Sequence, residues 1–230
     1  MERIFREFLK TKKNFVFVGE AGSGKSEIAI NFAIGLAKVS EKKVHFFDMD
    51  QTKPLFRSRD VREQLIAEGI EFHYQEQFFD APTIPGGVRE RLGDEESVVI
   101  LDVGGDHIGA RLIGAFDPFL NRDNTQNFFV INAYRPWSKN LVTIDGTMAR
   151  VLGMARIKLE NVSIMSNPNV GVTTTADEVL AGHEKVAEMI SEYLSIDYLC
   201  ALESLCPEIE GRTETSLIPI KLYLTYEWHL

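Results

Sequence analysis

Residues 19–26 read Gly-Glu-Ala-Gly-Ser-Gly-Lys-Ser and match the phosphate-loop pattern G-x-x-x-x-G-K-[ST] at every position. The loop follows the apolar run 15–18, which predicts a buried strand, and opens a helical pattern over 26–39. Its glycines let the backbone turn tightly around an anion, so that successive N–H groups and the start of the helix face the phosphates. Lys25 can reach phosphate oxygens as a point charge, and the Ser26 hydroxyl can ligate Mg²⁺. We therefore expect the following residues to bind a phosphate-bearing ligand: Gly22, Ser23, Gly24, Lys25, Ser26 and Glu27.

Apolar runs of strand length alternate with longer helical patterns along the rest of the chain. Near-continuous apolar strands between helices are typical of a parallel sheet covered on both faces. We expect one domain over residues 1–230, an α/β fold in the form of a three-layer α/β/α sandwich with a mainly parallel sheet. With the phosphate loop, this is the P-loop NTPase fold. The expected strands are 15–18, 44–47, 70–74, 98–101, 128–131, 162–165 and an edge strand at 218–225, and the expected helices are 26–39, 59–68, 138–152 and 175–194.

Carboxylates follow two of the predicted strands, at the edge where ligands bind to open α/β sheets. Asp48 and Asp50 come after the strand 44–47, and either could orient an attacking water or hold a metal-bound water. The strand 98–101 is followed by Asp102 and then by two glycines, which is the Walker B arrangement. Asp102 would hold Mg²⁺ through a water, and Gly105 would let the backbone approach a γ-phosphate and respond to it. The metal-binding residues that we expect are Ser26, Asp50 and Asp102.

The composition argues against several classes of protein. Among 230 residues there are 25 Lys and Arg against 34 Asp and Glu, a net charge of −9, which disfavours a general nucleic-acid or anionic-membrane binder. No apolar run approaches the roughly 18 residues of a membrane span. Residues 1–13 lack the uninterrupted apolar core of a signal peptide. We expect a cytoplasmic protein with no membrane span and no nucleic-acid partner.

The phosphate loop, Asp48-x-Asp50 and Asp102-x-x-Gly105 together resemble, in this order, the MinD/ParA-type P-loop ATPases of the SIMIBI class. The likeness runs from about residue 14 to 194. It implies that ATP and Mg²⁺ bind, that Asp50 in switch I positions the attacking water, that Asp48 lies near the metal shell and that Asp102 is the Walker B carboxylate. It also implies that Asn167, with Pro168 beside it, reads adenine. No Asn/Thr-Lys-x-Asp motif for guanine follows the later strands, which agrees with adenine.

The phosphate loop departs from that family at one position. Members carry G-K-G-G-x-G-K-[ST], in which the first lysine reaches across a dimer to the partner's phosphate, whereas this chain has Glu20 and then Ala21. A carboxylate cannot make that contact. Lys53, Arg57 or Arg59, all in the predicted switch I region, could supply the missing positive charge. The segment 132–137, after the strand 128–131, could line the nucleotide or a partner, or be a turn with Trp137 packed on a helix.

These observations favour a protein that binds Mg-ATP and ADP and hydrolyses ATP slowly. Switch I (Asp48–Asp50) and switch II (Asp102–Gly105) would carry the γ-phosphate state to a protein partner or to a nucleotide-dependent homodimer. Two alternatives stay open at this point. One is a small-molecule kinase or ligase on the same fold, and the other is a nucleotide-sensing regulatory module without useful turnover.

Overall fold

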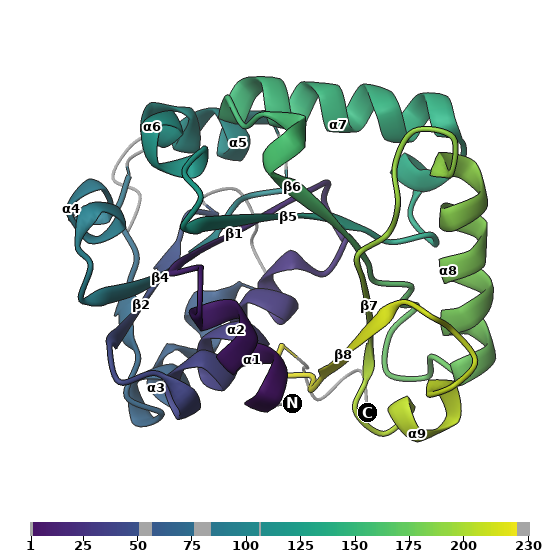
Figure 1. Cartoon of the computed structure of the whole chain (residues 1–230), viewed down its shortest axis with the longest axis horizontal. Helices are drawn as coiled ribbons and strands as arrows, with labels where there is room; N and C mark the ends of the chain where they lie inside the picture. Colours follow the sequence, from purple (N-terminus) through teal and green to yellow (C-terminus); the bar gives the residue numbers. More distant parts are fainter. Residues whose placement is uncertain (1, 51–56, 76–83, 106, 225–230) are drawn as a thin grey trace.

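In a computed structural model of the chain, residues 2–50, 57–75, 84–105 and 107–224 are described. They form one eight-stranded sheet in the order β3-β2-β4-β1-β5-β6-β7-β8, and every pair of neighbours is parallel (Figure 1). The strands are β1 (Asn14–Val18), β2 (Lys43–Asp48), β3 (Glu71–His73), β4 (Ser97–Asp102), β5 (Thr125–Ile131), β6 (Val162–Ser166), β7 (Tyr198–Leu202) and β8 (Ser216–Ile220).

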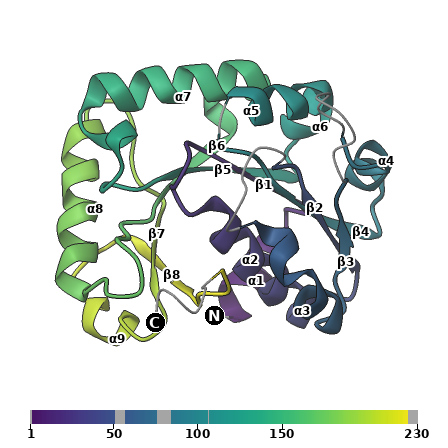
Figure 2. The same ribbon diagram turned by 180° about the vertical axis from the view of Figure 1, so that it is seen from behind.

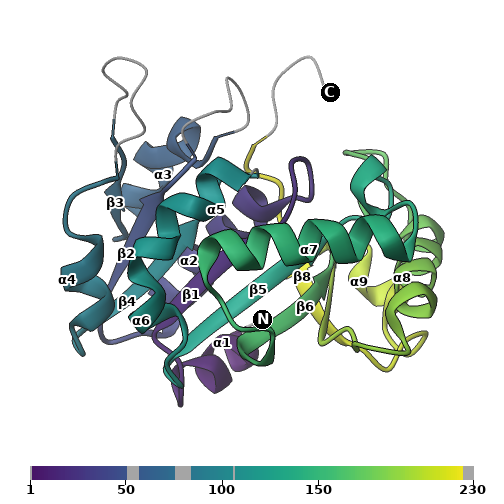
Figure 3. The same cartoon turned by 90° about the horizontal axis from the view of Figure 1, so that it is seen from above.

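Helices cover both faces of this sheet (Figures 1 and 2). One layer contains α1 (Glu2–Leu9), α2 (Lys25–Val39) and α3 (Arg62–Ala67). The other contains α4 (Val88–Gly93), α5 (His107–Ile113), α6 (Asp117–Leu120), α7 (Leu141–Ala155) and α8 (Ala176–Ile190), and α9 (Cys206–Ile209) packs at the end of α8. Figure 3 looks onto the α5–α7 layer with the strands behind it. The expected α/β/α sandwich is therefore confirmed.

The core has two parts, one on each face of the sheet, because successive side chains of a strand point to opposite faces. Phe15, Phe17 and Phe128 point toward α1 and α2, where their rings pack with Phe8 and Phe32 at centroid separations of 5.1–6.1 Å. The intervening residues of the same strands pack against α5 and α7 on the opposite face. The strands are thus buried on both sides, which explains their near-continuous apolar runs.

Most expected elements are present, with shifted ends. Strand β5 begins three residues earlier than expected, because Thr125 and Asn127 are buried and hydrogen-bonded rather than apolar. Helix α7 begins later, because Asn140 caps it by accepting a hydrogen bond from the Thr143 N–H at 2.9 Å. The edge strand β8 ends at Ile220, and residues 225–230 lie outside the described residues. The sequence patterns did not predict α1, α4, α5, α6, α9 or β7.

The sheet order determines where the candidate site lies. β1 lies between β4 and β5, and β2 lies on the other side of β4. In register, Phe17 of β1 faces Asp102 of β4, which faces Asp48 of β2. The loops that follow these strands therefore meet at one edge of the sheet. Among the described helices, none combines the length and the apolar character needed to cross a bilayer.

Candidate functional site: a phosphate loop between two switch segments

The phosphate loop joins β1 to α2 in a backbone conformation that favours glycine. Gly24 has φ 94° and forms the N-cap of α2, and Gly22 has φ 75°. A Cβ on Gly24 would lie 2.1 Å from the Asn167 side-chain nitrogen. A side chain at this position would therefore be strained in its backbone and would collide with its neighbour. The tight turn leaves the first N–H groups of a 15-residue helix at the mouth of the loop, which is a favourable arrangement for phosphate.

Lys25 lies within this loop rather than in solvent. Its side chain is buried, and its ammonium group donates a hydrogen bond to the Glu20 carbonyl at 2.8 Å. The end of switch II lies close to the same group, since a Cβ on Gly105 would be 3.1 Å from Lys25 Nζ and 2.7 Å from the Cα of Ala21. Gly105 therefore allows the switch II backbone to approach the loop, and its expected approach to a γ-phosphate stays a prediction.

Ser26 and Asp102 form the second part of the site. The Ser26 hydroxyl donates a hydrogen bond to Asp102 Oδ1 at 3.1 Å, and both residues are buried. One comes from the first turn of α2 and the other from the end of β4. A hydroxyl and a carboxylate oxygen are the type of ligand that Mg²⁺ prefers, directly or through water. The pair thus fits the metal that its sequence motifs predict.

Asp48, at the end of β2, lies in a buried ion pair. Its side chain is fully buried and accepts hydrogen bonds from Arg59 Nε at 2.6 Å and from the Asp50 N–H at 2.9 Å. Burial raises the pKa of Asp48, while the Arg59 guanidinium opposes the rise. Arg59 also donates to the Asp50 carbonyl. Asp48 therefore holds Arg59 and the backbone of Asp50, and its expected place near the metal shell stays a prediction.

Asp50 lies where the two switch segments meet. It is buried, and a Cβ on Gly104 would lie 3.4 Å from its Oδ1 and 3.6 Å from its Cα. The backbone of Met49, just before it, donates a hydrogen bond to the Asp102 carbonyl at 2.9 Å. The structure thus brings the carboxylate expected to position water next to the switch II glycines. This proximity joins two loops that lie some fifty residues apart in the chain.

Asn167 contacts the phosphate loop itself. Its side-chain nitrogen donates to the Ser23 carbonyl at 2.8 Å, and its backbone N–H donates to Ile131 at the end of β5. Pro168 packs toward α8, where a Cβ on Gly182 would be 2.6 Å from its ring. Both residues lie beside the loop, at the same edge of the sheet. The expected role of Asn167 and Pro168 in reading a base stays a prediction.

A basic side chain that the sequence did not single out for this role lies at the loop. Arg135, in the segment after β5, donates from Nε to the Gly22 carbonyl at 3.0 Å, and its side chain is exposed. The candidates named from the sequence are elsewhere: Arg59 pairs with Asp48, Arg57 lies 3.4 Å from Asp60, and Lys53 is outside the described residues. The signal available in the sequence was the position of Arg135 just after a central strand.

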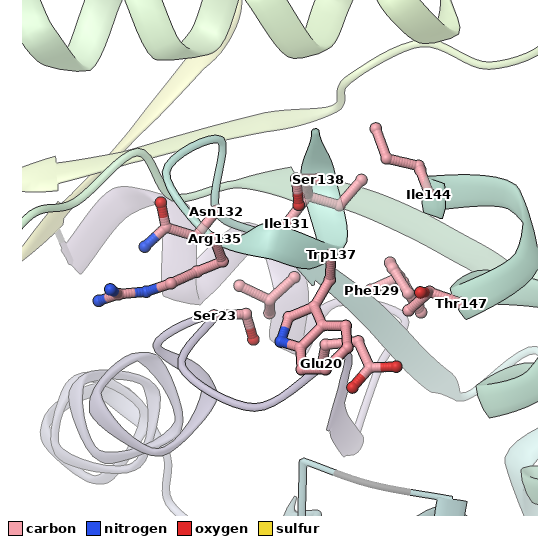
Figure 4. A pocket seen from close by; sticks show the side chains of 11 residues that line it. Glu20, Ser23, Phe129, Ile131, Asn132, Arg135, Trp137, Ser138, Ile144 and Thr147 are labelled. Carbon is pink, nitrogen blue, oxygen red and sulfur yellow. The ribbon is translucent and has the colours of Figure 1, made fainter. Parts of the chain in front are cut away.

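A small pocket lies between the phosphate loop, the end of β5 and helix α7 (Figure 4). Glu20, Ser23, Arg135 and Trp137 line it together with residues of β5 and α7. Its volume of about 10 Å³ is close to the space that one water molecule occupies. The pocket is therefore a packing gap, and it is too small for a nucleotide base.

The Glu27 side chain faces the end of the described chain. Its carboxylate accepts hydrogen bonds from the N–H groups of Tyr223 and Leu224, the second at 3.2 Å. One turn along α2, Asn31 exchanges two hydrogen bonds with the backbone of Lys221, at 2.8 and 2.9 Å. Burial raises the pKa of Glu27 to about 7, and the two backbone donors oppose the rise. The Glu27 carboxylate therefore holds the segment after β8. Of Glu27, only the backbone N–H is left to bind phosphate.

Comparison with known proteins gives likenesses of structure alone. No protein-family model and no curated protein matches the sequence. The signal recognition particle 54 kDa protein from Aeropyrum pernix K1, in complex with GDP, is 20% identical over 80% of this chain and 45% of its own, with a TM-score of 0.46. The receptor FtsY from Elizabethkingia anophelis is 14% identical over 85% of this chain and 64% of its own (TM-score 0.45). FlhF complexed with GMPPNP and Mg²⁺ is 15% identical over 85% of this chain and 70% of its own (TM-score 0.41).

The extent of these likenesses limits what they assign. The chain spans less than half of the signal recognition particle protein and less than two thirds of FtsY. At such identities and TM-scores they assign neither a nucleotide nor a partner. What the candidate site can do therefore follows from its own residues: a phosphate loop, a buried lysine, an adjacent hydroxyl and carboxylate, and a second carboxylate nearby.

Proposed function

We propose that this protein binds Mg-ATP at residues 22–27 and hydrolyses it slowly, as a switch that acts on a protein partner or on a second copy of itself. The observation that carries the proposal is the contact between Ser26 and Asp102 beside the buried Lys25. Two motifs that are separate in the sequence, the phosphate loop and the strand end at Asp102, meet there, which supports binding of a nucleoside triphosphate with its metal.

Each residue has a role that its position supports. The N–H groups of the loop and the Lys25 ammonium bind the phosphates. Ser26 and Asp102 would hold Mg²⁺, which supplies positive charge to the phosphate oxygens when bound. Asp50 orients the attacking water, and the Asp48–Arg59 ion pair fixes the backbone that carries it.

The switch action rests on the glycines of switch II. Gly104 lies against Asp50, and Gly105 lies against Ala21 and Lys25. A γ-phosphate near Lys25 would contact this backbone, so that nucleotides with and without it would favour different loop conformations. A partner that binds one of these conformations more tightly would then read the nucleotide state.

We assign the base as adenine because the chain has no Asn/Thr-Lys-x-Asp motif. The titles of two structural neighbours name GDP and GMPPNP, so GTP is the competitor to test. Hydrolysis of Mg-ATP and Mg-GTP by the full chain, with each nucleotide competing against the other, measures the preference. If ATP inhibits GTP hydrolysis more strongly than GTP inhibits ATP hydrolysis, the site prefers adenine. The opposite result overturns the assignment of adenine.

Arg135 is our candidate for the charge that Glu20 does not provide. Its guanidinium lies at Gly22 within the same chain, so it would act without a partner subunit. Arg135→Ala should lower kcat for ATP, whereas Arg135→Lys, which keeps the charge, should retain part of it. Arg57→Ala is the matched control, because Arg57 pairs with Asp60. Equal rates for Arg135→Ala and the wild type would remove this role.

The alternative of a sensor without turnover differs in one measurable respect. Asp50→Asn should reduce hydrolysis of ATP while leaving its binding largely unchanged, because Asp50 acts on water rather than on the phosphates. If the wild-type chain binds ATP but hydrolyses it no faster than Asp50→Asn does, both as a monomer and as a dimer, the protein is better described as a nucleotide sensor without turnover.

A further inference from the structure

Two histidines and a glutamate gather at the β2–β3 edge of the sheet, outside the nucleotide site. His45 Nδ1 lies 3.1 Å from His73 Nε2 and 3.2 Å from a carboxylate oxygen of Glu71. The three candidate ligand atoms all lie within 4.8 Å of one another. His45 and Glu71 are register partners on neighbouring parallel strands, and His73 is two residues after Glu71. All three therefore project on the same face of the sheet.

The geometry points to a binding site for a divalent transition metal of the zinc class, held by His45, Glu71 and His73. Two imidazole nitrogens and one carboxylate oxygen form a familiar three-residue zinc set that leaves a fourth position open. At Zn–N distances of about 2.0–2.1 Å, two tetrahedral ligand atoms are separated by roughly 3.3 Å. The observed 3.1 and 3.2 Å are close to this value, so small ring movements suffice.

The environment favours neutral imidazoles, the form that binds metals. Burial lowers the pKa of both His45 and His73. Without a metal, one ring N–H can be shared between Nδ1 of His45 and Nε2 of His73. With a metal at these two nitrogens, each neutral ring would carry its proton on its other nitrogen. The His73 ring also stacks on Phe47 at a centroid distance of 4.4 Å, which restricts its orientation. Side chains fixed by packing lose less entropy when they bind an ion.

Access and charge are compatible with an ion at this place. The side chain of Glu71 is 45% exposed, so the site opens to solvent on one side, while His45 is buried beneath it. Two cations are nearby: Lys43 lies 3.6 Å from Glu71, and Arg91 of α4 pairs with Asp94. The Lys43–Glu71 pair is half-exposed, and such pairs contribute little. Lys43 can therefore turn to solvent when Glu71 binds a metal.

Titration of the full chain with Zn²⁺, in excess Mg²⁺ and without nucleotide, tests the site by calorimetry, with Co²⁺ absorption as a check of tetrahedral geometry. We expect one Zn²⁺ per chain and an increase in Tm. His73→Gln and Glu71→Gln should each weaken binding by at least about 10-fold, and His45→Gln should do the same. His183→Gln is the matched control, since His183 is a buried histidine on α8 bonded to Thr215, and it should bind Zn²⁺ like the wild type.

The outcomes separate this site from others in the chain. Glu71 and His73 lie at the sheet edge, so their variants keep the test valid even if the buried His45→Gln does not fold. The absence of stoichiometric Zn²⁺ binding would overturn the proposal. Binding with unchanged affinity in both His73→Gln and Glu71→Gln would do so too, because the ion would then lie elsewhere. Lys25→Ala should leave Zn²⁺ affinity unchanged, since the nucleotide site is separate.

Discussion

The Ser26 hydroxyl donates a hydrogen bond to Asp102 across 3.1 Å, although the two residues lie 76 positions apart in the chain. The contact joins the first turn of α2 to the end of β4, and both side chains are buried. It brings the hydroxyl of the phosphate loop and the carboxylate at the end of β4 to one point. Mg²⁺ dependence of nucleotide binding should therefore rest on this pair.

Ser26→Ala and Asp102→Asn should each reduce the affinity for Mg²⁺ in the nucleotide complex by about tenfold or more, which is about 1.4 kcal/mol. The reason is that each removes an oxygen ligand or the charge that holds a metal-bound water. Nucleotide affinity measured over a Mg²⁺ series checks this. Ser163→Ala, a half-buried serine in β6 bonded to Gln126, is the matched control. An identical Mg²⁺ dependence in Ser26→Ala and the control would contradict the assignment.

Removing the partner of a buried charge should destabilise the protein. Arg59→Ala leaves Asp48, whose side chain is fully buried, without its guanidinium, and we expect a loss of about 3 kcal/mol in the free energy of unfolding. Arg57→Ala breaks a half-exposed pair with Asp60, and it should cost less than about 1 kcal/mol. Denaturant unfolding of the two variants measures the difference. Similar losses for both would show that the Asp48–Arg59 pair is not the stabilising contact.

The phosphate loop and the strand-end carboxylates could be predicted because their signals are local. Residues 19–26 form a contiguous motif, and Asp102 directly follows an apolar strand. Because β1, β4 and β2 are neighbours in the parallel sheet, the residues that follow them meet at one edge. Helix α1 could not be found in this way, because it is short and charged, and its burial depends on the ring of Phe5 fitting against Gly35 of α2.

Contacts between distant parts of the chain were the part that the sequence could not reveal. Arg135 and Gly22 are 113 residues apart, and Glu27 and Tyr223 are 196 apart. No local pattern links such residues, since a hydrogen bond between segments so far apart leaves no signal in the sequence of either segment. Asp48 illustrates the same limit: its position after a strand indicates function, and only the approach of Arg59 shows that it is held in an ion pair.

Glu27 should control how firmly the segment after β8 is held. Glu27→Ala removes the acceptor for the N–H groups of Tyr223 and Leu224. Above about pH 7, where the Glu27 side chain is mostly charged, exchange of these two amides should become about tenfold faster or more, because a hydrogen bond to a charged group contributes about 1.5–3 kcal/mol. Hydrogen exchange of the C-terminal peptides measures this, with Glu63→Ala, an exposed glutamate on α3, as the control. Unchanged exchange in Glu27→Ala would show that other contacts hold the segment.

His183 should make stability depend on pH. It is buried on α8 with Nε2 3.0 Å from the Thr215 hydroxyl, and burial lowers its pKa below the ordinary 6.5. The unfolded chain therefore takes up a proton near pH 6.5, while the folded chain resists it. The stabilising contribution is complete above that pH and declines as the pH falls toward the folded pKa.

His183→Gln removes this titration. The difference in unfolding free energy between wild type and His183→Gln should be constant above about pH 7 and should shift against the wild type as the pH falls toward 5. Denaturant unfolding at several pH values gives both curves. Parallel curves over this interval would mean that the environment of His183 does not change its proton affinity.

The most direct test of the central claim is calorimetric titration of the full chain with Mg-ATP, in parallel with Lys25→Ala. We expect one nucleotide per wild-type chain and a loss of most of the affinity in Lys25→Ala, because the buried ammonium group is the main positive charge of the loop. Wild-type affinity in Lys25→Ala, or no binding of Mg-ATP or Mg-GTP to the wild type, would contradict the assignment of residues 22–27 as a nucleotide site.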